Sequence, residues 1–155
     1  MPDESLNLNQ ILAEDIMSEG VVSVKPDMLL GQVAHLMLRD RVSGVPVLDN
    51  DQRIVGIVTL TDFFILLDKI SQDLPGEGDD ARSKTLHSVL EQTKNLPVSA
   101  IMSKTIVSIS PKMTLKEILD IVIKWQTHTL PVMSDGKVVG VIGRHDILNA
   151  IYVYG

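Results

Sequence analysis

Two aspartates at matching places are the residues of this chain best suited to binding chemistry. Asp62 follows T-L-T and Asp146 follows G-R-H, and each stands at the expected start of a helix. A carboxylate there can accept hydrogen bonds from the two hydroxyls of a ribose, or it can simply favour the positive end of the helix dipole. The backbone N–H groups that follow Thr59 and Gly143 could bind a phosphate. The residues by themselves leave the binding and capping interpretations open.

The two aspartates belong to an internal repeat that spans most of the chain. D-I-M-S near the N-terminus recurs as A-I-M-S, V-V-S-V-K-P-D-M recurs as I-V-S-I-S-P-K-M, and S-G-V-P-V-L-D recurs as H-T-L-P-V-M-S. Matching residues keep a constant spacing until the second hairpin, which is one residue shorter. The matched pairs include Met17 and Met102, Pro26 and Pro111, Met28 and Met113, Pro46 and Pro131, and Gly56 and Gly140. Such a repeat indicates two copies of one structural unit.

Each copy is predicted to have the order strand-helix-strand-strand-helix, from its apolar periodicity and turn residues. The first copy has expected strands at 21–24, 45–48 and 53–58 and helices at 28–37 and 59–70. The second has expected strands at 106–109, 129–133 and 137–142 and helices at 114–126 and 144–153. Thr114 with Glu117, and more loosely Thr59 with Asp62, has the spacing of a capping box.

Helical lead-ins are expected before both copies, at 6–14 and at 82–95. Between the copies, residues 71–81 have the composition of an acidic surface loop, whose simplest role is solubility, with partner docking left open. The expected domain boundaries are 1–70 for the first copy with its lead-in, 71–98 for the loop and linker helix, and 99–155 for the second copy.

Composition narrows the classes of protein that this chain can be. The 155 residues are 45% hydrophobic and only 3% aromatic, so aliphatic side chains must build the core. The absence of cysteine excludes disulfides and thiolate chemistry and fits a cytoplasmic location. No apolar run approaches the ~20 residues that span a bilayer, so no membrane association is expected. The net charge of −6 disfavours nucleic acid as a partner.

The order of elements, together with S-G-V-P-V and T-L-T-D, resembles the CBS domain family, and two tandem copies resemble a CBS pair, or Bateman module. The resemblance implies an α/β fold in which the two repeats pack with pseudo-two-fold symmetry. It implies that clefts between the repeats bind an adenine nucleotide (AMP, ADP or ATP) or S-adenosylmethionine. Such a module does no chemistry itself and regulates a separate effector protein. The family often forms disc-like dimers through exposed helices, so a homodimer is expected.

The resemblance also carries binding residues onto both copies. In the first copy they are Ser23, Ser43, Gly44, Val45, Pro46, Thr59 and Asp62. In the second copy they are Ser108, His128, Thr129, Leu130, Pro131, Arg144, His145 and Asp146. The strands with Val45 and Leu130 would line an apolar slot for the base, and the aspartates would accept from the ribose.

The two copies are not equal where a phosphate would bind. Gly143 stands where the first copy has the hydroxyl of Thr59. Positive charge is available in compensation from Arg144, His145 and His128. Ligand is therefore expected in both clefts, with the more phosphate-rich ligand at the second copy.

Three alternatives to a nucleotide sensor stay open. One is a dimerisation or interaction module with empty clefts, another is a nucleic-acid binder, and the last is a small nucleotide hydrolase. Catalysis is not expected, because the P-loop, G-x-G-x-x-G and G-x-S-x-G motifs are all missing. The four histidines lack metal-site spacing, so no metal is expected. Trp125, at the end of a predicted helix, is expected at an interface between repeats or subunits.

Overall fold

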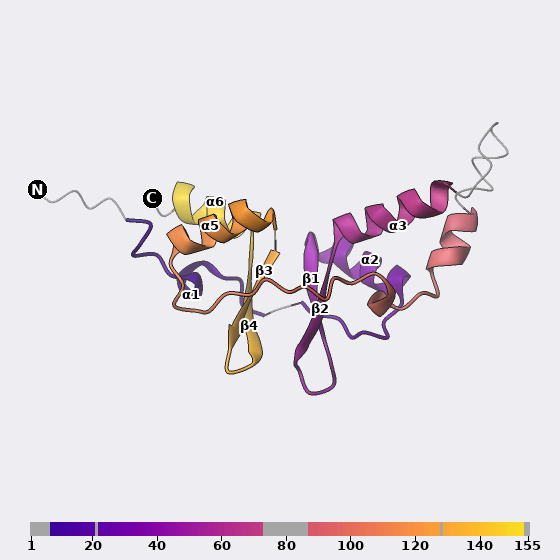
Figure 1. The fold of residues 1–155 in the computed structure, drawn as a ribbon, viewed down its shortest axis with the longest axis horizontal. Helices are drawn as coiled ribbons and strands as arrows, with labels where there is room; N and C mark the ends of the chain where they lie inside the picture. Colours follow the sequence, from indigo (N-terminus) through magenta and orange to yellow (C-terminus); the bar gives the residue numbers. More distant parts are fainter. Residues whose placement is uncertain (1–6, 21, 73–86, 128, 154–155) are drawn as a thin grey trace, which may run out of the picture. The chain divides into compact units, whose positions relative to one another are not determined.

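A computed structural model describes residues 7–20, 22–72, 87–127 and 129–153 (Figure 1). Helices and two-stranded sheets alternate along the chain, which confirms the predicted α/β class. The elements are α1 (Ala13–Ile16), α2 (Leu30–Asp40), β1 (Gly44–Leu48), β2 (Ile54–Thr59), α3 (Leu60–Gln72), the 3-10 helix η1 (Val98–Ala100), α5 (Leu115–Trp125), β3 (Thr129–Ser134), β4 (Lys137–Gly143) and α6 (Arg144–Tyr152). Residues 87–93 are also helical.

The chain divides into two compact units that do not follow the order of the sequence. The first-repeat unit contains Ser23–Asn50 and Val55–Thr105. The second-repeat unit contains Ile106–Gly155 together with Met1–Val22 and the short piece Asp51–Ile54. The segment that precedes each repeat is thus grouped with the other repeat.

In the first-repeat unit, α2 buries one apolar face. Leu30, Val33 and Met37 recur at helical spacing and are buried with Val45 and Val58. The helix ends where Arg41 adopts a left-handed conformation, with φ of 53°. Val24 pairs in parallel with β1, because its N–H donates to Pro46 O at 3.1 Å and its carbonyl accepts from Leu48 N at 2.8 Å.

The second-repeat unit repeats this arrangement around the antiparallel pair β3 and β4. Thr129 faces Gly143 and Ser134 faces Lys137 in their register. Asp135 and Gly136 both have positive φ, as expected of the tight Asp-Gly turn. Thr114 caps α5: its hydroxyl accepts from Glu117 N at 3.2 Å and the Glu117 carboxylate reaches back, so the predicted capping box is confirmed.

Each lead-in completes the sheet edge of the unit in which it lies. Ser18 exchanges two backbone hydrogen bonds with Val141, of 2.9 and 3.1 Å, and Ser103 does the same with Ile57, at 2.9 and 2.8 Å. Beside these bonds Met17 lies against Gly140. At the matching place in the other unit, Met102 lies against Gly56. The close approach of a methionine explains why the repeat has glycine in both copies.

Two expectations about local structure need correction, and a third is not tested. The lead-in helix predicted at 6–14 is wrong, because residues 8–10 form turns and the helix covers only Ala13–Ile16. The strands predicted at 21–24 and 106–109 reduce to single pairing residues, Val24 and Ile109, within the described residues. Residues 73–86, which contain most of the predicted acidic loop and the start of the linker helix, lie outside the described part of the chain.

Candidate functional site

In the first-repeat unit, the predicted binding residues gather where the strands meet the start of α3. Leu60 N donates to Ser43 O at 3.0 Å, which ties the residue before β1 to the first turn of α3. The pairing of Val24 with Pro46 and Leu48 brings Ser23 to the same strand. Thr59 ends β2 and directly precedes α3. The first-copy residues listed from the sequence therefore occupy one continuous edge.

Asp62 closes the first turn of α3 by accepting hydrogen bonds from Thr59. The backbone N–H of Thr59 donates to Oδ2 at 2.8 Å, and its hydroxyl donates to the same oxygen at 3.2 Å. The predicted capping interaction is thereby confirmed. Within the described residues, Oδ1 of Asp62 accepts no hydrogen bond. One oxygen of this half-buried carboxylate thus serves the fold, and the other keeps its capacity to accept.

The second-repeat unit has the same edge, built from β3, β4 and the start of α6. Ile109 N donates to Pro131 O at 3.0 Å, which places Ser108 beside β3, and Thr129 is the register partner of Gly143. Thr129 is 6% exposed and the only buried polar or charged residue in the described part of the chain. His128, expected at this edge, lies outside the described residues.

Asp146 is held differently from Asp62. Gly143 N donates to its Oδ2 at 2.7 Å, whereas its Oδ1 accepts from the hydroxyl of Ser18 at 2.9 Å. The sequence-based list missed Ser18. A signal was nonetheless present, because glycine at 143 removes the hydroxyl that the first repeat has at Thr59 and leaves a place for another donor.

Arg144 and His145 are exposed at the N-terminal end of α6. Positive side chains are unfavourable there, because the helix dipole places partial positive charge at the same end. No described carboxylate forms an ion pair with either side chain. The start of α6 therefore carries the positive charge of Arg144 next to backbone N–H groups, with the carboxylate of Asp146 in the same turn.

The strand side chains expected to line a base slot belong to the cores. Val45 and Leu130 are each 1% exposed, and Leu130 belongs to the core cluster of the second-repeat unit. Their side chains contribute to packing, and contact with a base would have to come from other atoms of these strands.

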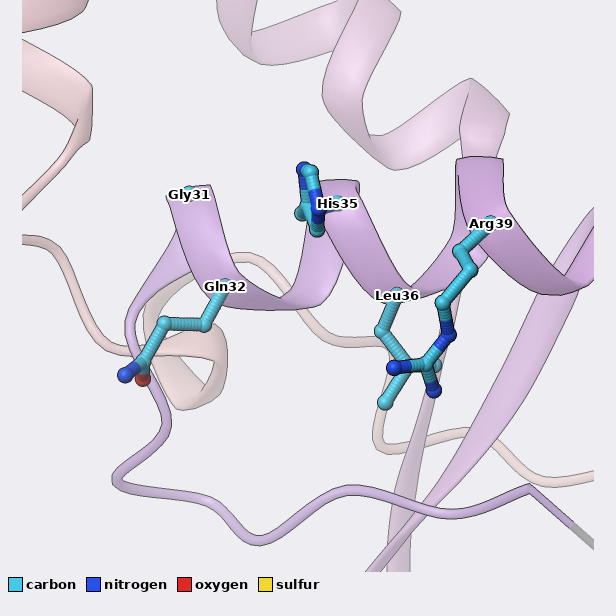
Figure 2. Close-up of a pocket in the computed structure, with 5 residues that line it drawn as sticks. All are labelled: Gly31, Gln32, His35, Leu36 and Arg39. Carbon is cyan, nitrogen blue, oxygen red and sulfur yellow. The ribbon is translucent and has the colours of Figure 1, made fainter.

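Two surface hollows elsewhere on the first-repeat unit have polar side chains that do not point toward a common ligand position. Figure 2 shows one that is lined by a single helix, with Gln32, His35 and Arg39 along the same face of α2. Arg39 is engaged by Asp40, whose hydrogen bond raises the pKa of the guanidinium. The second hollow has Lys25 bonded to Asn50 at 3.1 Å. Among the described residues, no three potential ligands gather to hold a metal ion, and no helix is long and apolar enough to cross a membrane.

Comparison with known proteins identifies the repeated unit. The family model for the CBS domain matches residues 13–69 and 98–153, so the chain belongs to the CBS domain family and contains two copies of the domain. Each matched region begins at the helical turn of a lead-in, α1 or η1.

Similar proteins occur in distant organisms. The chain is 27% identical to an uncharacterized protein of Methanocaldococcus jannaschii, over 94% of this chain and 95% of that protein. It is 31% identical to the chloroplastic CBS domain-containing protein CBSX1 of Arabidopsis thaliana, over 82% of this chain, and it spans only 57% of that longer protein. The crystal structure of CBSX2 in complex with AMP has a TM-score of 0.71 and 21% identity, and covers 93% of this chain and 98% of that one.

Proposed function

We propose that the chain is a regulatory module that binds adenosyl ligands at the strand-to-helix edge of each repeat and signals their presence to a partner protein. The observation that carries the proposal is the matched pair of carboxylates, Asp62 and Asp146, each at the third position of the helix that follows β2 or β4. The binding of AMP by CBSX2, which has the same fold, supports the choice of ligand class.

In the first repeat, the free oxygen of Asp62 is suited to a ribose hydroxyl. Oδ2 is occupied by Thr59, and Oδ1 has two lone pairs that no described residue uses. A ribose donating to Oδ1 would leave the helix cap intact. Capping and ligand binding are therefore compatible roles for this one side chain.

In the second repeat, the start of α6 is suited to phosphate groups. Arg144 is unfavourable at the positive end of the helix dipole, so an anion bound at the same N-terminus would relieve that repulsion and accept from the backbone N–H groups. The corresponding residues of α3 are Leu60 and Thr61, which are uncharged. A ligand with more phosphate groups should therefore prefer the second repeat.

Calorimetric titration with AMP, ADP, ATP and S-adenosylmethionine tests the proposal. We expect Asp62→Asn and Asp146→Asn each to remove or weaken one binding event by about tenfold, because each variant loses a charged acceptor. Arg144→Ala should weaken ATP more than AMP, and Lys124→Ala, which changes a cation on α5, is the matched control. If none of the four compounds binds, the alternative of an interaction module with empty clefts is favoured. A ligand that binds both Asn variants with the stoichiometry and affinity of the wild type would refute the assigned residues.

A second copy of the chain is the partner we propose for the apolar surface of the helices. The 13-residue helix α3 has no buried residue, and Phe64 and Ile65 on it are each 62% exposed. On α6, Leu148 is 54% and Tyr152 81% exposed. Sedimentation velocity should give a dimer that Phe64→Glu dissociates, while Lys69→Glu on the same helix leaves it intact. A monomeric wild type would exclude this dimer.

A further inference from the structure

The hydroxyl that the second repeat lacks at its helix start is supplied from a distant part of the chain. In the first repeat, Thr59 gives Asp62 both a backbone N–H and a hydroxyl. In the second repeat, Gly143 gives Asp146 only the N–H, and the hydroxyl comes from Ser18 in the N-terminal lead-in. Each aspartate thus has one amide donor and one hydroxyl donor, although the hydroxyls come from different elements.

This bond is not an automatic result of the repeat. Ser103 occupies the place of Ser18 in the other unit and makes the same pair of backbone hydrogen bonds. Its hydroxyl nevertheless donates to the carbonyl of Thr105, at 3.3 Å, and not to Asp62. The serine reaches the aspartate only in the repeat whose helix start has no hydroxyl.

The distribution of donors matters because a carboxylate oxygen has two lone pairs. Asp146 uses one on each oxygen, so one remains on Oδ1 and one on Oδ2. A cis-diol presents two hydroxyls side by side and can donate one to each oxygen. Asp62 uses its lone pairs on Oδ2 alone, so it offers a diol only Oδ1.

We propose that Ser18 is a positioning residue for the second repeat: its hydroxyl fixes the Asp146 carboxylate so that both oxygens face a ribose diol. The orientation of Asp146 toward a diol rests on the proposed function, whereas the fixing of its carboxylate by Ser18 does not. Because Ser18 directly follows Met17, which packs on Gly140, and is itself paired with Val141, docking of the N-terminal lead-in should control where the Ser18 hydroxyl holds the carboxylate.

Amide hydrogen exchange in the ligand-free protein tests the fixing of the carboxylate. In Ser18→Ala, exchange of the Gly143 amide should rise about fivefold, since its acceptor Asp146 has lost its second anchor. The Thr59 amide, which donates to Asp62, is the internal control and should not change. Ser103→Ala should change neither amide. Ser18→Thr keeps a hydroxyl and should behave like the wild type.

Rescue separates a positioning role from general destabilisation. Gly143 has φ of −108° and ψ of 177°, an extended conformation that threonine adopts readily. Gly143→Thr should therefore restore a hydroxyl at the helix start, as at Thr59. In the Gly143→Thr background, Ser18→Ala should no longer accelerate exchange of the amide at position 143.

Affinity for AMP, measured by calorimetry in an Asp62→Ala background, tests the consequence for the ligand. Ser18→Ala should raise Kd about tenfold and Ser103→Ala less than about twofold. Gly143→Thr should not restore the affinity of Ser18→Ala, because its hydroxyl recreates the donor pattern of Asp62, in which only Oδ1 is open to a diol. Equal effects of the two alanine variants on both exchange and affinity would overturn the inference. If this background binds no AMP, the proposed function fails for the second repeat, and the exchange experiment alone then supports or refutes the fixing of Asp146.

Discussion

Replacement of glycine by alanine should have opposite effects at two positions of the first-repeat unit. A Cβ at Gly56 would lie 2.5 Å from Met102 Sδ, 2.9 Å from Met102 Cγ and 3.0 Å from the Ser103 carbonyl oxygen. A Cβ at Gly31, in the first turn of α2, would meet nothing within 4 Å. The same chemical change therefore overpacks one site and only stiffens the chain at the other.

The contacts at Gly56 set the expected size of the effect. The Met102 side chain can partly retreat, whereas the Ser103 carbonyl is held at 2.9 Å by Ile57 N and cannot. Overpacking of this kind costs about 1–3 kcal/mol, and the fixed carbonyl places Gly56→Ala in the upper half of that range. Gly140→Ala should cost less, because its three closest atoms all belong to the Met17 side chain. Gly31→Ala should stabilise by about 0.5–1 kcal/mol.

Urea unfolding followed by circular dichroism measures these differences, provided that the m-value stays constant. A double-mutant cycle with Met102→Ala localises the cause, since the cost of Gly56→Ala should shrink once the thioether is removed. The reasoning is refuted if Gly56→Ala is neutral or stabilising like Gly31→Ala, or if its cost is unchanged in the Met102→Ala background.

Three other substitutions have directions that the structure fixes. Thr114→Ala should cost about 1 kcal/mol in urea unfolding, because it removes the capping hydroxyl of α5, while Thr105→Ala, at an exposed position, should cost little. Gln126→Gly should raise the thermal midpoint, because glycine adopts the left-handed conformation at φ of 51° without strain. The hydrogen bond to Glu14, of 2.6 Å, raises the pKa of Lys112. The stabilisation of the fold by this ion pair is therefore complete below the ordinary lysine pKa of about 10.4, and it is lost as pH rises through the raised value. The difference in urea midpoint between wild type and Lys112→Met should therefore close at high pH, and a constant difference would contradict that assignment.

The sequence predicted the elements of each repeat well because local signals define them. The helical spacing of Val33 and Met37 and the capping pair at Thr114 fall where the structure has them. The short strands were predicted too long, because Val24 and Ile109 each pair with only one neighbouring strand over a single residue. An apolar run cannot reveal how many partners its backbone will find.

The grouping of each lead-in with the other repeat could not be predicted, since periodicity carries no information about contacts distant in sequence. The repeated methionine and glycine were visible in the sequence, but their mutual contact was not. The same limit hid Ser18: its motif, I-M-S, occurs in both copies, yet the hydroxyl contacts an aspartate in only one. The candidate residues were found by their position in the repeat, whereas their hydrogen-bond partners required the structure.

The two units agree in backbone and differ in the source of one hydroxyl, and this difference has a consequence for signalling. Thr59 and Asp62 lie three residues apart, so the first carboxylate is fixed by its own helix start. Asp146 depends on Ser18, which is attached to its unit through the lead-in. A partner that pulled the lead-in away would release Asp146 and leave Asp62 in place. By reciprocal linkage, a ligand that requires a fixed Asp146 would strengthen docking of the lead-in. The N-terminal segment is therefore where we expect occupancy of the second repeat to be transmitted.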